Sequence, residues 1–320
     1  MDEKRAYLGI NNIYHGFSEQ LMYQMEPNSV ALSVWSPPYN VGKDYEKGQS
    51  FADWQKMLKA VIDAHNYVLK PGGFMVINIA DILCFPDEAM PKIQIENPSL
   101  HKSSVTKEDI LAVLKEHPDY KRKKIAEVLG CSEQTVDRRL HGVNIRGGKY
   151  ITQTRVQLVG NILQDFAHQQ GLFLYDRRIW KKDPSWANSR WTNSSYKSVD
   201  EFEYLYFFWK PGEMSVRRDR LTDNEWKEWG SRAIWDFPSV RANKEHEAMF
   251  PIELPSRCIR LLTDKGDTVL DPFMGSGTTA LACIGLGRNY IGFDKEAKYV
   301  HLAKSKIAEV QATLFAGETP

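Results

Sequence analysis

Short apolar runs alternate along the chain with stretches that have helical spacing. Val30–Trp35 is an apolar run interrupted only by Ser33, which is typical of a strand buried on both faces of a parallel sheet. The runs at 74–79 and 290–293 have the same character. Because strands alternate with helices, the pattern predicts an α/β fold with a doubly wound, mostly parallel sheet. We also expect extended structure at residues 6–13 and 172–180, and helices at 18–25, 156–169 and 250–262.

A strand, a glycine turn and the start of a helix follow one another between residues 269 and 282. Glycines let a ligand approach the backbone, and the free N–H groups of a helix N-terminus face it. Asp294 comes 23 positions after Asp271, where its carboxylate can accept hydrogen bonds from both hydroxyls of a ribose. We therefore expect a cofactor that carries a nucleoside. The turn reads Asp271-Pro272-Phe273-Met274-Gly275-Ser276-Gly277-Thr278-Thr279.

This turn differs from two common nucleotide-binding loops. A dinucleotide fingerprint reads G-x-G-x-x-G, and a phosphate-binding loop ends in Gly-Lys-Ser or Gly-Lys-Thr. Gly277 is followed instead by Thr278, Thr279 and Ala280. A Gly-x-Gly turn alone would equally suit an ordinary strand-to-helix connection. The whole string, however, resembles the S-adenosylmethionine loop of DNA amino-methyltransferases, which implies S-adenosylmethionine as the cofactor.

The strand at 30–35 ends in Ser36-Pro37-Pro38-Tyr39. Two consecutive prolines cannot continue a β-ladder, so the chain leaves the sheet here with fixed φ angles and bare carbonyls. Ligands of open α/β sheets bind beyond the carboxyl ends of the strands, where this tetrapeptide is expected. Taken alone, it would be an ordinary turn after a strand.

The tetrapeptide also has the groups that activate an exocyclic amine of a nucleobase. Such an amine is a poor nucleophile because its lone pair is delocalised into the ring. If the Ser36 hydroxyl and the Pro37 carbonyl both accept hydrogen bonds from the NH2 group, the lone pair turns toward a methyl donor. Tyr39 offers a flat ring for base stacking, worth roughly 1–3 kcal/mol. The rigid prolines fix this geometry before the substrate arrives.

Ser-Pro-Pro-Tyr resembles the catalytic motif of amino-methyltransferases, whose first position is Asp, Asn or Ser. The motif precedes the cofactor loop, with an insertion between them, and this order resembles the beta group of these enzymes. The likeness covers nearly all of the chain except about residues 84–150. One departure is Phe17, which stands where the family often has the acid of Gly-Asp-Ser. The resemblance implies catalytic roles for Ser36, Pro37, Pro38 and Tyr39, and it places Phe250 and Pro251 near the cofactor.

Residues 84–150 read as a separate helical module. Helices are expected at 107–116, 121–129 and 132–140, with Gly130 in the turn between the last two. This arrangement matches helix-turn-helix packing. The side chains expected to pack together are Ile110, Leu111, Leu114, Ala126, Val136 and Leu140, and Ser132 is expected to cap the third helix.

The third helix of this module can enter the major groove of DNA. Residues 101–182 hold 16 Lys/Arg against 9 Asp/Glu, although the whole chain has a net charge of only +1. This excess points to an acidic polymer as the partner. A loop at 183–198, with Trp186, Arg190 and Trp191, could contact DNA or pack locally. The alternative for the module is a three-helix packing unit with a solvated charged face. The residues expected to contact DNA are Gln134, Thr135, Arg138, Arg139, Lys123 and Lys124.

Together these features predict a site-specific DNA methyltransferase. We expect a first catalytic part at 1–83, an inserted helix-turn-helix target-recognition module at 84–150, and a second catalytic part with the cofactor loop at 151–320. Serine in the first motif position resembles the cytosine-N4 group, so N4 of cytosine in double-stranded DNA is the expected target. N6 of adenine is the alternative within the same group. Because a base inside a duplex cannot reach Tyr39, it must be flipped out of the helix.

Two other classes of protein stay open. One is a helix-turn-helix regulator that binds DNA without turnover, and the other is an RNA or protein methyltransferase. Methylation of cytosine carbon-5 is disfavoured because it needs a thiolate nucleophile, and no cysteine follows a proline here.

Composition limits where in the cell we expect the protein. No run of about 18 apolar residues occurs and the first residues are charged, so neither a membrane span nor export is expected. The sequence leaves open whether a cognate restriction endonuclease accompanies the protein and whether it forms a homodimer. The four cysteines lack metal-ligand spacing, so we expect no metal site and reduced thiols in the cytoplasm; they are Cys84, Cys131, Cys258 and Cys283.

Overall fold

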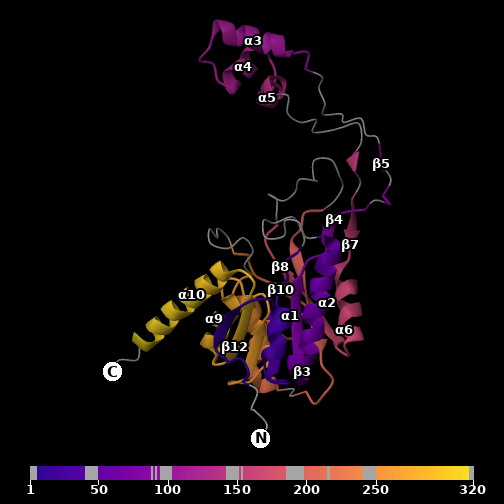
Figure 1. Ribbon diagram of the computed structural model, residues 1–320, viewed down its shortest axis with the longest axis vertical. Coiled ribbons are helices and arrows are strands. Elements are labelled where there is room, and N and C mark those ends of the chain that lie inside the picture. The colour runs from indigo at the N-terminus through magenta and orange to yellow at the C-terminus, as the bar shows by residue number, and fades with distance from the viewer. Residues whose placement is uncertain are drawn as a thin grey trace. The chain divides into compact units, whose positions relative to one another are not determined.

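The computed structural model divides the chain into two compact units (Figure 1). The first unit comprises Met1–Ile82 and Gln157–Pro320, and the second comprises Leu83–Val156. The structure describes residues 6–39, 50–87, 89–90, 92–93, 103–141, 151–152, 154–184, 198–214, 217–240 and 250–316.

An eight-stranded sheet forms the centre of the first unit. All its strands run in one direction except β9, which is antiparallel to both of its neighbours. This confirms the predicted α/β fold with a mostly parallel sheet. In spatial order the strands are β1 (Asn12–His15), β12 (Asn289–Asp294), β11 (Thr268–Asp271), β2 (Val30–Trp35), β3 (Leu69–Ile79), β9 (Phe202–Trp209), β8 (Phe173–Lys181) and β10 (Ile234–Asp236).

Helices cover both faces of this sheet. One group consists of α1 and its extension η1 together with α2 and α6, which pack against one another. The other group consists of α8, α9 and α10 (Figure 1). The helix bounds are α1 (Ser18–Leu21), η1 (Met22–Gln24), α2 (Phe51–Val68), α6 (Val159–Gln169), α8 (Glu253–Leu262), α9 (Thr278–Leu286) and α10 (Ala297–Ala316), and three short helical turns follow β9, namely η4 (Arg218–Arg220), α7 (Asp223–Glu225) and η5 (Trp226–Gly230).

The strand order reverses between β2 and β11. The chain passes from β2 through α2 to β3 on one side, and from β11 through α9 to β12 on the other side. Right-handed crossovers in opposite directions place the two helices on opposite faces of the sheet. A crevice for ligands is therefore expected beyond the carboxyl ends of β2 and β11, where the two loops diverge.

The core next to the carboxyl ends of β2 and β11 is rich in aromatic side chains that contact one another. Trp35, Trp54 and Phe293 are fully buried, and the Trp35 ring stacks on His65 with 5.6 Å between centroids. Burial lowers the pKa of His65 to about 4, so the ring is neutral near pH 7. Its Nε2 lies 2.8 Å from the Ser33 hydroxyl, a contact that fastens α2 to β2.

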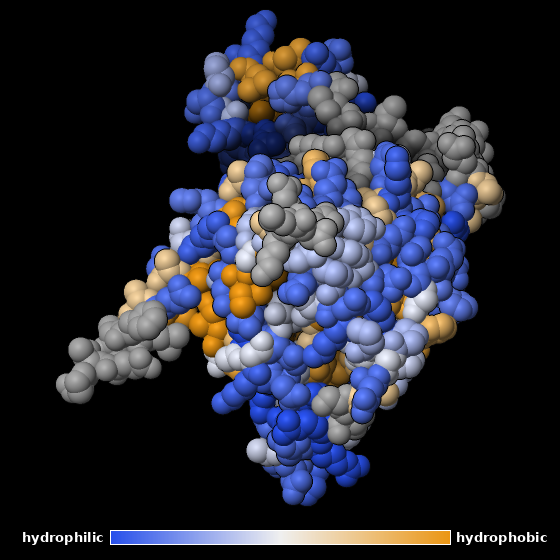
Figure 2. Space-filling model, turned by 60° about the horizontal axis from the view of Figure 1, so that its bottom comes forward, coloured by the Kyte–Doolittle hydropathy of each residue, from blue (hydrophilic) through white to orange (hydrophobic). Residues whose placement is uncertain are grey.

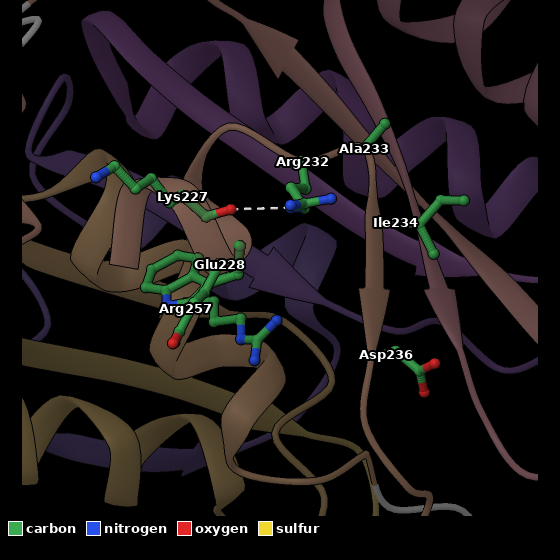
Figure 3. A pocket seen from close by; sticks show the side chains of 8 residues that line it. Lys227, Glu228, Arg232, Ala233, Ile234, Asp236 and Arg257 are labelled. Carbon is green, nitrogen blue, oxygen red and sulfur yellow. Dashed lines mark hydrogen bonds between the residues drawn. The ribbon is translucent and has the colours of Figure 1, made fainter. Parts of the chain in front are cut away.

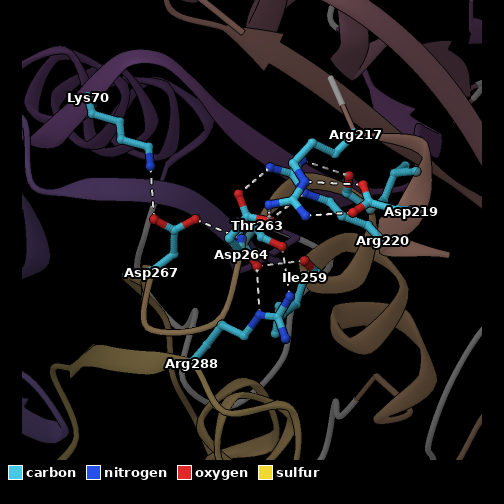
Figure 4. Close-up of polar contacts among 10 residues, drawn as sticks. Lys70, Arg217, Asp219, Arg220, Ile259, Thr263, Asp264, Asp267 and Arg288 are labelled. Atoms are coloured by element: carbon cyan, nitrogen blue, oxygen red, sulfur yellow. Dashed lines mark hydrogen bonds and ion pairs between the residues drawn. The ribbon is translucent and has the colours of Figure 1, made fainter. Parts of the chain in front are cut away.

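A polar cluster stabilises the opposite end of the central strands, where the chain enters β11 (Figure 4). Asp264 accepts hydrogen bonds of 3.0 and 2.8 Å from Arg220, and Asp267 accepts one of 2.9 Å from Lys70. Both aspartates belong to the turn that enters β11 at its amino end. These charges therefore stabilise the scaffold and lie at the other end of β11 from the expected crevice.

In the described part of the second unit there are three helices and two strand pairs. Its helical core is built from Ile110, Ile125, Ala126 and Val136, with Leu114 and other apolar side chains packed around them. Gly130 has a positive φ of 61° in the turn between α4 and α5, a conformation that favours glycine. The elements are β4 (Ile82–Pro86) paired with β7 (Thr154–Gln157), β5 (Lys92–Ile93) paired with β6 (Ile151–Thr152), and the helices α3 (Lys107–Glu116), α4 (Arg122–Val128) and α5 (Glu133–His141).

Four local predictions were wrong. The helix expected from residue 250 begins at Glu253, after an N-cap at Ile252. The strand expected at residues 6–13 is confined to Asn12–His15, because only this segment lies beside β12. The helix expected from residue 156 begins at Val159, since Thr154–Gln157 forms strand β7. Leu111, expected among the packed side chains of the first helix of the module, is 48% exposed, because a three-helix unit covers only one side of α3.

Hydrophilic side chains predominate on the face of the molecule shown in Figure 2, and the apolar side chains there form limited patches. Among the described residues, no helix is both long and apolar enough to span a membrane.

Candidate functional site

Two loops leave neighbouring parallel strands at the reversal of the strand order. The tetrapeptide that begins at Ser36 follows β2, and the glycine turn follows β11, which pairs directly with β2. The rings of Trp35 and Phe273 lie 5.4 Å apart, centroid to centroid. The two motifs that the sequence places far apart are therefore brought together at one edge of the sheet.

A side chain of α2 holds the tetrapeptide in place. The indole Nε1 of Trp54 donates a hydrogen bond of 2.6 Å to the carbonyl of Pro38. Among the described residues, no donor reaches the carbonyl of Pro37. Pro37 is itself buried, whereas Ser36 and Tyr39 are half-buried. Among the described residues, the Pro37 carbonyl and the Ser36 oxygen thus keep the capacity to accept hydrogen bonds.

Tyr39 connects the tetrapeptide to a buried carboxylate. Its hydroxyl accepts a hydrogen bond of 3.0 Å from the Ser36 hydroxyl. It donates one of 2.7 Å to Oε2 of Glu203, near the start of β9. Burial and the negative charge of Glu203 raise the pKa of Tyr39 well above its ordinary value. The phenol therefore stays protonated and acts as a donor to Glu203.

Glu203 is in turn paired with a lysine. Lys182 donates a hydrogen bond of 2.6 Å to Oε1 of Glu203 and lies 3.3 Å from a carboxylate oxygen of Asp200. Burial alone would lower the pKa of Lys182, but these two carboxylates outweigh it and raise the pKa. Sequence reasoning missed this network. The available signal was a single acid in the otherwise apolar and aromatic run of β9.

The glycine turn, which is the expected cofactor loop, is shaped by Asp271, a residue only 1% exposed. One of its carboxylate oxygens accepts a hydrogen bond of 3.0 Å from the backbone N–H of Phe273, and the other accepts one of 2.6 Å from the Thr279 hydroxyl. Burial raises the pKa of Asp271 to about 7, in spite of these hydrogen bonds. The contacts of Asp271 are therefore with the loop and with α9, and they fix the path of the turn.

Two glycines of the turn have conformations that favour glycine. Gly275 has a φ of 52° and Gly277 a φ of 90°. A Cβ on Gly277 would also lie 3.1 Å from the Cβ of Ala303 on α10. Pro272 and Ser276 are buried within the loop, and Thr278 is the half-buried first residue of α9. The turn is therefore compact and brings its backbone close to the expected ligand.

Asp294 lies at the carboxyl end of β12, beside the turn. Its Oδ2 accepts a hydrogen bond of 3.0 Å from the N–H of Gly275, and its Oδ1 accepts one of 2.8 Å from the N–H of Glu296. Burial raises the pKa of Asp294 above its ordinary value. The side chain is half-buried, and each carboxylate oxygen can accept a further bond.

The residues present fit a nucleoside cofactor with a charged tail. Asp294 keeps acceptor capacity for sugar hydroxyls beside the glycine turn. Within the described ranges, no side chain caps the N-terminus of α9, so its first N–H groups can face an anionic group. Phe250 and Pro251 precede α8, where both are half-buried, and Phe250 packs against the main core.

The predicted DNA contacts lie on α4 and α5 of the second unit. Ser132 caps α5 as predicted, because its hydroxyl accepts a hydrogen bond of 3.2 Å from the N–H of Thr135. Two of the predicted contacts have protein partners, since Arg139 donates 3.0 Å to the carbonyl of Val105 and Lys124 lies 3.2 Å from Glu127. Of the six predicted DNA contacts, three have exposed side chains that bond no described residue, namely Gln134, Arg138 and Lys123.

A hollow lies beside the edge strand β10 (Figure 3). Arg257, one of its lining residues, is 2.6 Å from Glu253 and lies over the ring of Phe237. Asp236, another, pairs with Lys181 at 2.8 Å. Arg257 and Asp236 are thus paired within the protein, and none of the residues that line this hollow belongs to the two loops.

Several predicted features lie outside the described residues. They include Trp186, Arg190 and Trp191 of the loop that could contact DNA, as well as residues 246–249, through which the family resemblance runs. Within the described ranges, no group of three or more His, Cys, Asp or Glu side chains could hold a metal ion.

Comparison with known proteins identifies the family. A family model described as a DNA methylase, of the N6/N4 methyltransferase type, matches residues 30–305. The chain is 55% identical over 302 residues to the type II methyltransferase M.BglI of Bacillus subtilis, which covers 94% of this chain and 87% of that protein.

Solved structures agree with the fold. The PvuII DNA methyltransferase, described as cytosine-N4-specific, matches with a TM-score of 0.61 and 17% identity, over 98% of this chain and 95% of that one. A putative DNA modification methylase from Thermus thermophilus, complexed with S-adenosyl-L-methionine, matches with a TM-score of 0.57 and 23% identity over 93% of each chain. This chain therefore belongs to the DNA methylase family of N6/N4 methyltransferases.

Proposed function

We propose that this protein transfers a methyl group to the exocyclic N4 amine of cytosine in double-stranded DNA, at a specific site. The observation that carries the proposal is the pairing of β2 with β11, which sets the Ser36 tetrapeptide beside the glycine turn. An acceptor for an amine and a cradle for a methyl donor thus share one edge of the sheet. Positioning of two reactants in this way is a large part of catalysis.

The methyl donor is S-adenosylmethionine, whose sulfonium carries an electrophilic methyl group. Asp294 would hold the ribose hydroxyls, and the turn from Asp271 to Thr278 would face the rest of the cofactor. Within that turn, Asp271 acts mainly as a support, because both of its oxygens already bond to Phe273 and Thr279. Phe250 and Pro251 are proposed neighbours of the cofactor on the strength of the family resemblance.

Ser36 and Pro37 activate the amine. No described donor reaches the Pro37 carbonyl. The Ser36 hydroxyl donates its hydrogen bond to Tyr39, so the lone pairs of its oxygen remain able to accept one. Two hydrogen bonds accepted from the NH2 group make its lone pair available to the methyl donor. The buried Pro37 and the Pro38 carbonyl bond to Trp54 hold these acceptors in place. Tyr39 supports the flipped base by stacking.

Cytosine is favoured over adenine by the residue in the first motif position. Serine there resembles the cytosine-N4 group, and both bases present a similar exocyclic amine. N6 of adenine is therefore the second outcome that the experiment below must distinguish.

The inserted module at 84–150 reads the target sequence. The positions of α5 that favour this role are Gln134 and Arg138, because their side chains are exposed and bond no described residue. Lys123 offers an exposed charge for a phosphate. Thr135, Arg139 and Lys124 are weaker candidates, since each already has a partner within the module.

A restriction endonuclease of the same specificity is the expected functional partner. Its support is the likeness to the type II methyltransferase M.BglI. Such a partner shares the DNA site and need not bind the methyltransferase. Sedimentation of the purified protein decides between a monomer and a homodimer.

The test is mass spectrometry of nucleosides from unmethylated DNA incubated with the protein and labelled S-adenosylmethionine. Label in N4-methylcytosine supports the proposal. Label in N6-methyladenine keeps the mechanism and reverses the base. No label on any DNA or RNA, while calorimetry shows bound cofactor, would instead indicate a DNA-binding regulator or another acceptor.

A further inference from the structure

Glu203 reaches the active edge of the sheet because β9 runs against its neighbours. The parallel strands β3 and β8 end at this edge, whereas β9 begins there. Glu203 is the second residue of β9 and pairs in register with Trp180, near the end of β8. Its side chain is 8% exposed. On a parallel strand, a carboxylate would lie at this end of the sheet only if it came near or after the last residue of the strand.

The buried carboxylate is fixed on both oxygens. Oε1 accepts the 2.6 Å bond from Lys182, and Oε2 accepts the 2.7 Å bond from Tyr39. Asp200, 3.3 Å from Lys182, adds a second negative charge. A buried charge needs partners of this kind to offset its desolvation. As a carboxylate, Glu203 can only accept hydrogen bonds, and both of its oxygens already do so.

The acceptor at the end of the chain fixes the direction of every bond in it. Since a carboxylate cannot donate, the Tyr39 hydroxyl donates to Glu203 at 2.7 Å, and the Asn78 carbonyl at 3.4 Å is a second, more distant acceptor of the same proton. Burial and Glu203 raise the pKa of Tyr39, which keeps the phenolic proton in place. The Tyr39 oxygen then accepts from Ser36 at 3.0 Å. The single proton of the Ser36 hydroxyl is thus turned toward Tyr39 and away from the substrate.

This direction matters for an amine nucleophile. A serine that donated to the amine would occupy the lone pair that has to attack the methyl group. A serine that accepts from the N–H bond releases that lone pair. The same hydroxyl can therefore inhibit or promote the reaction, and its proton position decides which.

We propose that Glu203 is a positioning residue that, through Tyr39, keeps Ser36 as a hydrogen-bond acceptor toward the target amine. The proposal rests on the proposed function, since it describes how the same site handles its substrate. Glu203 does not touch the reacting atoms, and Lys182 and Asp200 serve to hold its charge.

The experiment compares four variants of the full chain: Tyr39→Phe, Glu203→Gln, the double variant, and the control Glu201→Gln. Tyr39→Phe keeps the stacking ring and removes the link. Glu203→Gln keeps the shape but adds an amide N–H that can donate to Tyr39 and reverse the chain. Glu201 is exposed and close in sequence, so its variant makes the same change of charge outside the network. The readouts are the single-turnover rate of DNA methylation, and cofactor and DNA affinities by calorimetry.

We expect Tyr39→Phe and Glu203→Gln each to lower the single-turnover rate about tenfold or more, as for loss of a hydrogen bond to a charged group. Cofactor and DNA affinities should stay within about twofold of wild type. The double variant should be no slower than Tyr39→Phe alone, because Glu203 acts only through Tyr39. Glu201→Gln should match wild type.

Additive losses in the double variant would overturn the proposal, as would a wild-type rate for Tyr39→Phe. If Glu203→Gln melts far below wild type, Tyr39→Phe decides alone, because it leaves the buried charges unchanged. A wild-type protein that binds the cofactor but methylates no nucleic acid would contradict the proposed function instead. The two failures are thus separate.

Discussion

The centroid of the Trp35 ring lies 5.4 Å from that of Phe273, at the carboxyl ends of β2 and β11. Trp35 precedes the proposed catalytic tetrapeptide, and Phe273 lies inside the proposed cofactor loop. This aromatic contact sets the spacing between the two halves of the site, so each half can be tested by its own chemistry.

Ser36→Ala should lower the single-turnover methylation rate about 10- to 100-fold, because the variant removes one of the two acceptors of the target amine. Cofactor affinity should be unchanged, since the cofactor loop is intact. Ser29→Ala is the matched control, because the Ser29 hydroxyl bonds to the carbonyl of Glu26, outside the tetrapeptide and the cofactor loop. Equal rates for Ser36→Ala and wild type would remove Ser36 from catalysis.

Asp294→Ala should weaken S-adenosylmethionine binding at least about tenfold in calorimetry, because hydrogen bonds to a charged group are worth about 1.5–3 kcal/mol. The variant also frees the N–H of Gly275, which Asp294 now binds. Asp236→Ala is the control, since Asp236 ends another strand, β10, and pairs with Lys181 away from the turn. Wild-type affinity in Asp294→Ala would contradict the ribose-binding role.

Asp271 should make the stability of the protein depend on pH. Burial raises its pKa from 3.8 to about 7 in the folded protein. The folded state therefore binds this proton more tightly than the unfolded chain, and the stability that the proton confers is lost as the pH rises from about 4 through about 7. The shift corresponds to at most about 4 kcal/mol.

The measurement is the free energy of unfolding of wild type and Asp271→Asn at pH 5 and pH 8. Relative to the variant, whose side chain stays neutral, wild type should be less stable at pH 8 than at pH 5. Asp165→Asn, on the exposed side of α6, should show no such difference. A constant gap between wild type and Asp271→Asn across this range would show that Asp271 is not buried as described.

Arg138→Ala should relax or abolish the choice of DNA site while the fold of the module is kept. A bidentate contact of Arg with guanine is worth about 1–3 kcal/mol of discrimination. Sequencing that maps methylated positions checks the result. Lys115→Ala removes the same charge from α3 of the same module and should leave the sites unchanged. Identical sites and rates for Arg138→Ala would exclude this residue from recognition.

Local patterns were sufficient to predict the strands and motifs at the centre of the site. The apolar run of Val30–Trp35 became β2 with the predicted bounds, because prolines end it sharply. The glycine turn leads into α9 at Thr278 as expected, since Gly277 takes a left-handed conformation just before it. Ser132 caps α5 because a side-chain oxygen there satisfies a free N–H group.

Contacts across the fold could not be predicted in the same way. Tyr39 and Glu203 are 164 positions apart, and only the antiparallel placement of β9 joins them. The burial of Asp271 between the loop and α9 likewise depends on packing, which no local pattern records. The strand at Thr154–Gln157 was mistaken for the start of a helix, because its pairing with β4 arises in the inserted segment.

The pairing of β2 with β11 also has a consequence for synthesis of the protein. The Ser33 hydroxyl oxygen lies 3.1 Å from the carbonyl oxygen of Leu270, 237 positions later in the chain. While the ribosome is still making the intervening residues, β2 has no neighbour on that side. Contacts between such distant segments form slowly, because a long loop must close first. A nascent chain therefore gains its cofactor site only after β11 has emerged and paired, and no earlier folding intermediate can modify DNA.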